Sequence, residues 1–212
     1  MKILAVVGDY YHSEASMKRA LEGVADELNS VELVFTNRKK LIQDLNREPD
    51  LVILGSENRM NPNKEVSEIW LTEDTATEIA KYVESGGSWL AWHSGMASYE
   101  KIRSYTDMLG GFFDYHPEKH QPVTYLYQSH SLFEDKSTSF QIIDEHYFVK
   151  YDEDVDVFLK SESVDGVSVG GWTKGYGEGR VACYTPAHLE NGMQRREVKD
   201  DLKRLIEWCL NR

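Results

Sequence analysis

The segment Ile3–Gly8, with the sequence ILAVVG, decides the fold. It is a continuous apolar run rich in β-branched residues and ends at a glycine, which is typical of a strand buried on both faces. A second run of this kind is Asp50–Gly55 (DLVILG). Between the two runs, Ser13–Leu28 has the apolar spacing of an amphipathic helix, Val31–Phe35 resembles a strand and Leu41–Leu45 a short helix. Alternating strands and helices predict an α/β fold with a parallel sheet and helices on both faces.

The rest of the chain continues this pattern and then changes to short strands. Thr75 and Glu78 predict a capping box for a third helix, which Gly86-Gly87 ends. Further predicted elements are a strand at 88–92, a helix at 96–109, strands at 123–127, 139–143, 155–160, 168–172 and 180–185, and a helix at 197–210. Because no linker or internal repeat separates these elements, we expect a single domain over residues 1–212.

Composition argues against several classes of partner. The chain has 212 residues, and its 36 acidic and 24 basic residues give a formal net charge of -12. Nucleic-acid surfaces and anionic membranes both require clustered positive charge. The longest apolar run, Ile3–Val7, is far too short to span a membrane, and the N-terminus has no signal-peptide pattern. Cys183 and Cys209 have no metal or redox spacing. We therefore expect a cytoplasmic protein with no nucleic-acid or membrane partner.

Ligand-binding groups of open α/β sheets lie beyond the carboxyl ends of the strands. Four segments satisfy this rule, at 8–12, 55–58, 92–96 and 186–190. The third is the most informative, because a strand runs directly into a tight turn and a helix, and Gly95 is small enough to let the turn bend back. This geometry is that of a nucleophile elbow, which presents one side chain above a helix N-terminus. The residue at the apex is His93.

These features resemble the class I glutamine amidotransferase superfamily, whose members carry a cysteine at the elbow and a distant His-x-Glu. Trp92–Met96 resembles that elbow with His93 in place of the cysteine, and His188–Glu190 resembles the His-x-Glu. Ser94 lies one position too late to replace the nucleophile. Without a thiol at the elbow the acyl-enzyme route is closed, so we expect no glutaminase activity.

A closer resemblance within that superfamily is to the trehalose-utilisation (ThuA-like) family. The matching motifs are Trp92–Gly95, His130-Ser131 leading to Asp144–Tyr147, and Trp172–Val181 followed by His188, with Ser131 in place of a more usual proline. The resemblance implies a flavodoxin-like, amidotransferase-like three-layer sandwich, with a mostly parallel central sheet and extra strands in the second half. It also implies a role in sugar metabolism.

The candidate catalytic residues are His93, Glu145 and His188. Two imidazoles facing a carboxylate can move protons to and from a substrate, and the same set can bind a divalent metal such as zinc. No closely spaced histidine pair supports a metal directly, since Pro117 separates His116 from His120. No dinucleotide-binding glycine motif follows the first strand, so no cofactor is predicted and the metal question stays open.

Aromatic and acidic residues near the same sheet edge suit a neutral carbohydrate, because sugar rings stack on aromatic faces while polar groups bind their hydroxyls. The candidate substrate-binding residues are Asp9, His12, Ser94, Trp172 and Glu190. Aromatic residues on the expected loops are compatible with a homodimer. Residues 56–70 and 112–121 fit no pattern.

Three functions remain open from the sequence. The first is an enzyme that acts on a saccharide or keto-sugar by His/Glu acid-base chemistry. The second is a non-catalytic sugar-binding or regulatory protein on an amidotransferase-like scaffold. The third is a metal-dependent hydrolase that uses His93 and His188 as ligands.

Overall fold

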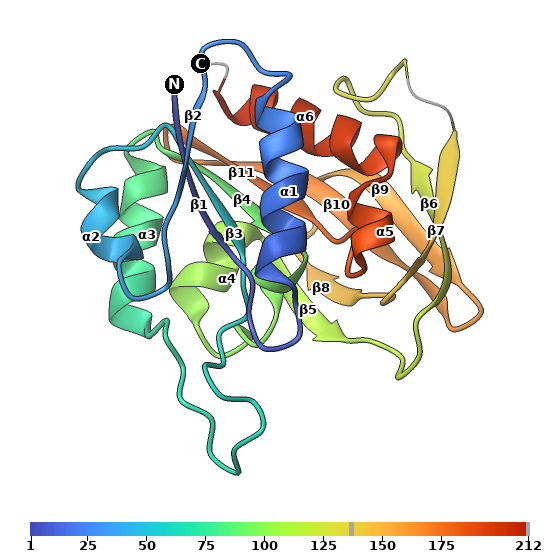
Figure 1. Ribbon diagram of the computed structural model, residues 1–212, viewed down its shortest axis with the longest axis horizontal. Coiled ribbons are helices and arrows are strands. Elements are labelled where there is room, and N and C mark those ends of the chain that lie inside the picture. The colour runs from blue at the N-terminus through green and yellow to red at the C-terminus, as the bar shows by residue number, and fades with distance from the viewer. Residues whose placement is uncertain (136–137, 211–212) are drawn as a thin grey trace.

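A large mixed sheet forms the centre of the molecule in the computed structural model, which describes residues 1–135 and 138–210 (Figure 1). Over these residues its strand order is β2-β1-β3-β4-β11-β10-β9-β6-β7. The parallel strands are β2 (Glu32–Phe35), β1 (Lys2–Val7), β3 (Leu51–Gly55), β4 (Ser88–Trp92) and β11 (Gly179–Tyr184). The antiparallel strands are β10 (Gly166–Tyr176), β9 (Asp156–Ser163), β6 (Gln121–Tyr127) and β7 (Ser139–Asp144). A separate antiparallel ribbon pairs β5 (Gly111–Tyr115) with β8 (Phe148–Tyr151).

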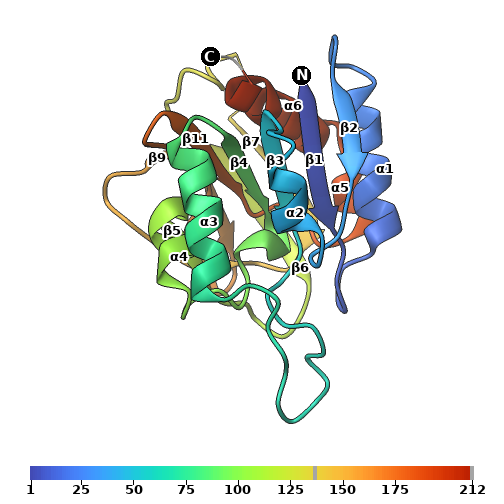
Figure 2. The ribbon, with the colours of Figure 1, turned by 90° about the vertical axis from the view of Figure 1, so that its left-hand side faces the viewer.

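Helices cover both faces of the parallel half of the sheet (Figure 2). On one face lie α1 (Glu14–Ala25), α5 (Glu190–Met193) and α6 (Arg196–Leu210), and on the other lie α2 (Leu41–Leu45), α3 (Glu73–Glu84) and α4 (Arg103–Leu109). The prediction of an α/β fold with a large, mostly parallel sheet is confirmed, and the extra antiparallel strands lie in the second half of the chain, as expected.

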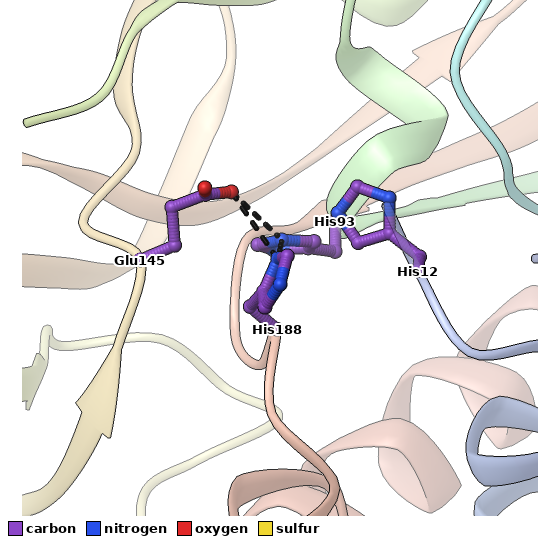
Figure 3. Close-up of side chains that lie close together, drawn as sticks. All are labelled: His12, His93, Glu145 and His188. Carbon is purple, nitrogen blue, oxygen red and sulfur yellow. Dashed lines mark hydrogen bonds and ion pairs between the residues drawn. The ribbon is translucent and has the colours of Figure 1, made fainter. Parts of the chain in front are cut away.

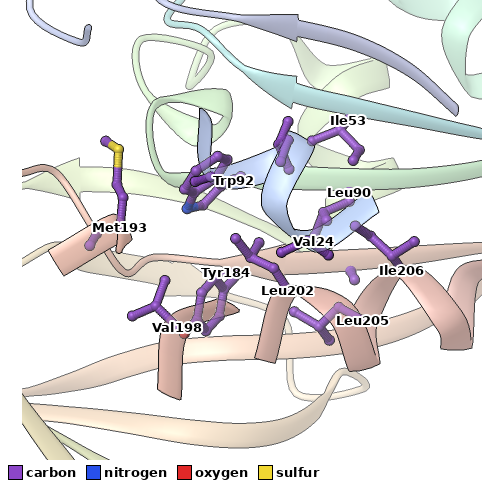
Figure 4. Packing of buried hydrophobic residues seen from close by; sticks show 14 of the residues in the cluster. Val24, Ile53, Leu90, Trp92, Tyr184, Met193, Val198, Leu202, Leu205 and Ile206 are labelled. Carbon is purple, nitrogen blue, oxygen red and sulfur yellow. The ribbon is translucent and has the colours of Figure 1, made fainter. Parts of the chain in front are cut away.

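Alternation along β1 explains why its sequence is apolar throughout. Ile3, Ala5 and Val7 pack into the core cluster beneath α1 and α6, whereas Leu4 and Val6 pack into the cluster beneath α2, α3 and α4. Figure 4 shows the first cluster, in which side chains of α1 and α6 meet those of β3, β4 and β11. Successive side chains of a strand point to opposite faces, so a strand between two helical layers needs apolar residues at every position.

The turn that follows β4 depends on a glycine. A Cβ atom at Gly95 would lie 2.0 Å from the carbonyl oxygen of Leu54, so the turn packs directly against the backbone of β3. His93 begins the turn with a φ of 47°, in the left-handed region that few non-glycine residues adopt. The predicted strand-to-turn geometry at His93 is therefore present.

The helix expected at 96–109 is shorter than predicted. A 3₁₀ turn covers His93–Met96, and α4 begins only at Arg103. Between them the backbone turns extended at Ala97, whose carbonyl accepts a hydrogen bond from the N–H of Asn58 in the loop after β3. This contact with a neighbouring loop replaces the helical hydrogen bond that the sequence pattern predicted.

The capping box of α3 was also assigned to the wrong residues. Thr72 is the N-cap, and the side-chain hydroxyl oxygen of Thr75 accepts a hydrogen bond from the backbone N–H of Thr72. The helix consequently begins at Glu73, and the predicted Thr75–Glu78 pair lies inside its first turns. The β5–β8 ribbon was not predicted as a unit. No helix within residues 1–135 and 138–210 is long and apolar enough to cross a membrane.

We predict that Gly95→Ala destabilises the protein. The added methyl group must displace the backbone of β3 or of the turn, which costs about 1–3 kcal/mol and lowers the Tm by roughly 3–10 °C. Thermal unfolding measures this loss. Gly175→Ala is the matched control, because a Cβ atom there meets nothing within 4 Å among the described residues. Equal Tm values for the two variants would contradict the packing argument.

Candidate functional site

A cavity of about 420 Å³ opens where β1, β3, β4 and β11 end. Its volume is within the range of small-molecule sites. The lining residues are Tyr11, His12, Glu57, Arg59, Ala97, Ser98, Phe113, His116, His120, Glu145, Tyr147 and His188. A larger hollow of about 650 Å³ lies between α2 and α3, but no histidine or cysteine is among its described lining residues. The chemistry is therefore concentrated at the smaller cavity.

Three histidines and one glutamate converge at this cavity (Figure 3). His12 follows β1, His93 follows β4, His188 follows β11, and Glu145 lies between β7 and β8. The Nε2 atom of His93 is 3.3 Å from Nδ1 of His188 and 3.5 Å from Oε2 of Glu145. Nδ1 of His188 is 3.3 Å from the same Glu145 oxygen. One ligand atom from each of the four residues lies within 4.8 Å of the other three.

The outward nitrogens of two of these histidines face groups that only accept hydrogen bonds. Nδ1 of His12 is 2.6 Å from Oδ1 of Asp9, and Nδ1 of His93 is 2.6 Å from the carbonyl oxygen of Thr185. Both Nδ1 atoms must therefore carry a proton, so that the lone pair of a neutral ring is on Nε2. Nε2 of His12 is buried without a hydrogen-bond partner among the described residues. The Nε2 atoms of both rings consequently belong to a cluster that also contains a carboxylate.

Burial and hydrogen bonding set the charges of the site. Although burial disfavours charge on Asp9, hydrogen bonding to His12 and to backbone N–H groups lowers the pKa of its carboxyl to about 2. Burial likewise opposes ionisation of Glu145, but its hydrogen bond with His188 lowers its pKa, so it is a carboxylate. Burial lowers the pKa of His93 and keeps its ring neutral. Although burial acts in the same direction on His188, its hydrogen bond with Glu145 raises its pKa.

Neighbouring residues hold the cluster in place. The ring of Tyr147 stacks on His93 with a centroid separation of 4.1 Å, and Phe113 packs on Tyr147. The buried carboxylate of Asp144 accepts a hydrogen bond from the backbone N–H of His188 at 2.7 Å. The backbone of His188 is therefore held independently of the contacts of its imidazole.

Five of the residues singled out from the sequence come together here. His93, Glu145 and His188 form the cluster with His12, and Asp9 lies directly behind His12. Strand ends that the strand-end rule selected supply four of them, and Glu145 follows the antiparallel strand β7.

The other three predicted substrate-binding residues lie elsewhere, and their assignment is corrected. Trp172 is completely buried in the core, where its indole N–H donates to the carbonyl of Leu109, because β10 is longer than expected and carries Trp172 inside the sheet. Glu190 lies outside the cavity lining and pairs with Arg19 and Ser16. Ser94 is buried and does not line the cavity either.

Several cavity residues were missed. Nε2 of His116 lies 3.3 Å from Oε1 of Glu145, and Nε2 of His120 lies 4.0 Å from the same atom. Both residues come from the loop after β5, so their proximity does not require the helix that Pro117 made doubtful. Glu57 and Arg59 come from the loop after β3. The strand-end rule selected segment 55–58 of this loop but no individual residue within it.

Comparison with known proteins identifies the family. The ThuA family model, described as trehalose utilisation, matches residues 2–209. The chain belongs to the ThuA family. No match was found among curated proteins.

Solved structures similar to this ThuA-family chain share its fold. A putative ThuA-like protein from Parabacteroides merdae has a TM-score of 0.80 at 14% identity, over 100% of this chain and 90% of its own. A cytoplasmic protein from Salmonella typhimurium LT2 has a TM-score of 0.71 at 13% identity, over 99% of both chains. A β-galactosidase from a Rahnella species has a TM-score of 0.66 at 13% identity, over 99% of this chain and 31% of its own.

We predict that Nδ1 carries a proton in both His12 and His93, and that His93 is the neutral Nδ1–H tautomer in the metal-free protein at neutral pH. Their partners, the Asp9 carboxylate and the Thr185 carbonyl, cannot donate a proton. Nitrogen-15 NMR of the ring nitrogens distinguishes the two tautomers and the imidazolium. Asp9→Ala should remove the preference of His12 for a proton on Nδ1 and leave the preference of His93 unchanged. Nε2–H tautomers in the unaltered protein would contradict the assignment.

Proposed function

We propose that this ThuA-family protein is a metal-dependent enzyme of sugar metabolism, which acts on a neutral saccharide or keto-sugar in the histidine-lined cavity. In this proposal His12, His93, His188 and Glu145 hold a divalent cation. The substrate class is supported by the family description, trehalose utilisation, and by an aromatic and polar cavity lining. The metal is supported by the cluster alone.

One observation carries the metal assignment. The unprotonated Nε2 of His93 and the carboxylate of Glu145 present lone pairs to each other at 3.5 Å, a contact that a shared cation would stabilise. Ligands held tetrahedrally about 2.0–2.1 Å from a zinc ion are about 3.3 Å apart. The separations among His93, His188 and Glu145 are 3.3–3.5 Å.

The surroundings of the ligands also suit a metal. Histidine ligands usually donate their other ring N–H to a carboxylate or a backbone carbonyl, which is the arrangement at His12 with Asp9 and at His93 with Thr185. Three imidazoles and one carboxylate favour a transition metal such as zinc over magnesium or calcium. A bound ion of this kind polarises a sugar oxygen and activates water at neutral pH.

The chain itself determines where a substrate approaches. His12, Glu145 and His188 line the cavity, whereas His93 is fully buried behind them, so the cluster is open on one side only. Phe113 and Tyr147 give this side apolar ring surface for a sugar. His116 and His120 lie at the other oxygen of Glu145 and are about one-third exposed, where they can donate hydrogen bonds to sugar hydroxyls.

The scaffold supports a function other than amide transfer. The strand order β2-β1-β3-β4-β11 of the parallel half supports assignment to the flavodoxin-like, amidotransferase-like class. The apex of the turn after β4 holds His93, and both cysteines are buried away from the cavity lining. We therefore propose that the protein has no glutaminase activity.

We predict about one divalent metal ion per chain in protein purified without chelator, as measured by elemental analysis. His12→Ala and His188→Ala should each reduce this content sharply, because each removes one of four ligands. Glu190→Gln is the matched control, since Glu190 follows the same strand as His188 but lies outside the cluster. Chelation should lower the Tm of the unaltered protein and leave that of His12→Ala unchanged.

A metal-free protein that is fully active on sugars would overturn the metal assignment. Proton transfer by His93, Glu145 and His188, the first function considered from the sequence, would then explain the activity.

We predict that His188→Ala lowers turnover on a panel of disaccharides and keto-sugars by a factor on the order of 10² to 10⁴. The fold should persist, because the backbone of His188, which the substitution keeps, makes the hydrogen bond to Asp144. Steady-state kinetics and thermal unfolding measure the two effects. A protein that binds sugars without converting them would show weakened affinity and no rate, and unchanged turnover at unchanged Tm would exclude His188 from the site.

A further inference from the structure

Glu57 is a second buried carboxylate at the cavity, and the four-residue cluster does not include it. Its side chain is 2% exposed and follows β3, the strand between β1 and β4. A carboxylate this buried normally has every oxygen hydrogen-bonded.

One carboxylate oxygen of Glu57 is firmly held. Oε2 accepts a hydrogen bond from Nε of Arg59 at 2.8 Å and another from Oγ of Ser98 at 3.0 Å. The backbone is anchored as well, because the N–H of Glu57 donates to Oδ2 of Asp9 and its carbonyl accepts from the indole of Trp70. The carboxylate therefore has one orientation.

The other oxygen, Oε1, has no hydrogen-bond partner among the described residues. Arg59 and Ser98 both contact Oε2, so neither satisfies Oε1. Glu57 nevertheless lines the cavity, beside the exposed ring of Tyr11, over which the guanidinium of Arg59 lies at 5.9 Å. Oε1 is covered in this structure, so a ligand group reaches it only with a shift of the side chains around it, and Oε1 is then an acceptor that no described residue satisfies.

A hydroxyl is the ligand group that fits this oxygen best. Burial raises the pKa of Glu57 despite its contact with Arg59. An ionised Glu57 would repel an anionic ligand group, and a protonated Glu57 would not attract a cation. A hydroxyl both donates and accepts, and it forms a hydrogen bond with either form.

We propose that Glu57, held by Arg59 and Ser98, is the residue that recognises a hydroxyl of the sugar, with Tyr11 as the adjoining ring surface. This assignment rests on the proposed function and adds a sugar-recognition residue on the β3 side of the cavity. The cation-binding cluster and the recognition residue are then separate sets of side chains in one cavity.

The test measures sugar binding and metal content together. Isothermal titration calorimetry with glucose, trehalose and their keto derivatives compares the unaltered protein with Glu57→Gln, and Glu190→Gln serves as the control. We expect Glu57→Gln to weaken binding by about 10- to 100-fold, since an amide replaces an acceptor held by Arg59. Metal content and Tm should stay close to those of the unaltered protein, because Glu57 is not one of the four ligands.

Monodeoxy analogues of the sugar that binds best distinguish recognition from a structural role. The analogue that lacks the recognised hydroxyl should bind the unaltered protein and Glu57→Gln equally weakly. Every other analogue should still bind the unaltered protein more tightly than Glu57→Gln. Equal affinity of the two proteins for the full sugar would overturn the assignment of Glu57 alone. Failure of the metal-loaded, unaltered protein to bind any sugar of the panel would overturn the substrate class and this assignment together.

Discussion

The parallel alignment of β1, β3, β4 and β11 is the constraint on which the site depends. Their carboxyl ends meet at one edge of the sheet, so residues 12, 57, 93 and 188 become neighbours although the chain separates them widely. Close contact between the turn after β4 and the backbone of β3 keeps His93 at this edge, and Gly95 makes that contact sterically feasible. If either strand moved by one residue, the side chains at this edge would face the opposite helical layer.

The antiparallel half of the sheet and the segments next to it supply the remaining residues of the site. Glu145 lies in the break between β7 and β8, and β5 leads into the loop that carries His116 and His120. These segments bring the only carboxylate of the four-residue cluster and most of the cavity's aromatic surface. Their arrangement also limits the exposure of the cluster to bulk water, which strengthens the electrostatic interactions within it. The extra strands are thus part of the site and not an addition to a finished fold.

The sequence was informative where one local rule determines the outcome. Two-sided burial made the strands of the parallel half recognisable, and the strand-end rule selected His12, His93 and His188 without any contact information.

Prediction from the sequence failed where long-range packing determines the position of a residue. Trp172 was predicted as the last residue of a strand at 168–172, next to a loop, but β10 runs for 11 residues and takes it into the core. His116 and His120 have no periodic pattern, because their position depends on the path of a loop between two strands that pair with different partners. The start of α3 was misplaced because Thr72 and Thr75 form a reciprocal cap that the acidic capping pattern does not describe.

Asp9 links the two parts of the cavity through one buried carboxylate. Its Oδ1 atom accepts from the ring of His12 at 2.6 Å, and its Oδ2 atom accepts from the backbone N–H of Glu57 at 2.9 Å. The first contact sets which nitrogen of His12 faces the cluster, and the second positions the loop that carries the unpaired oxygen of Glu57. Because both contacts draw on the same ionised group, a change that protonates or removes Asp9 must disturb the proposed metal ligand and the proposed sugar contact at once. Asp9 is therefore better understood as the residue that aligns the two halves of the site than as a substrate-binding residue in its own right.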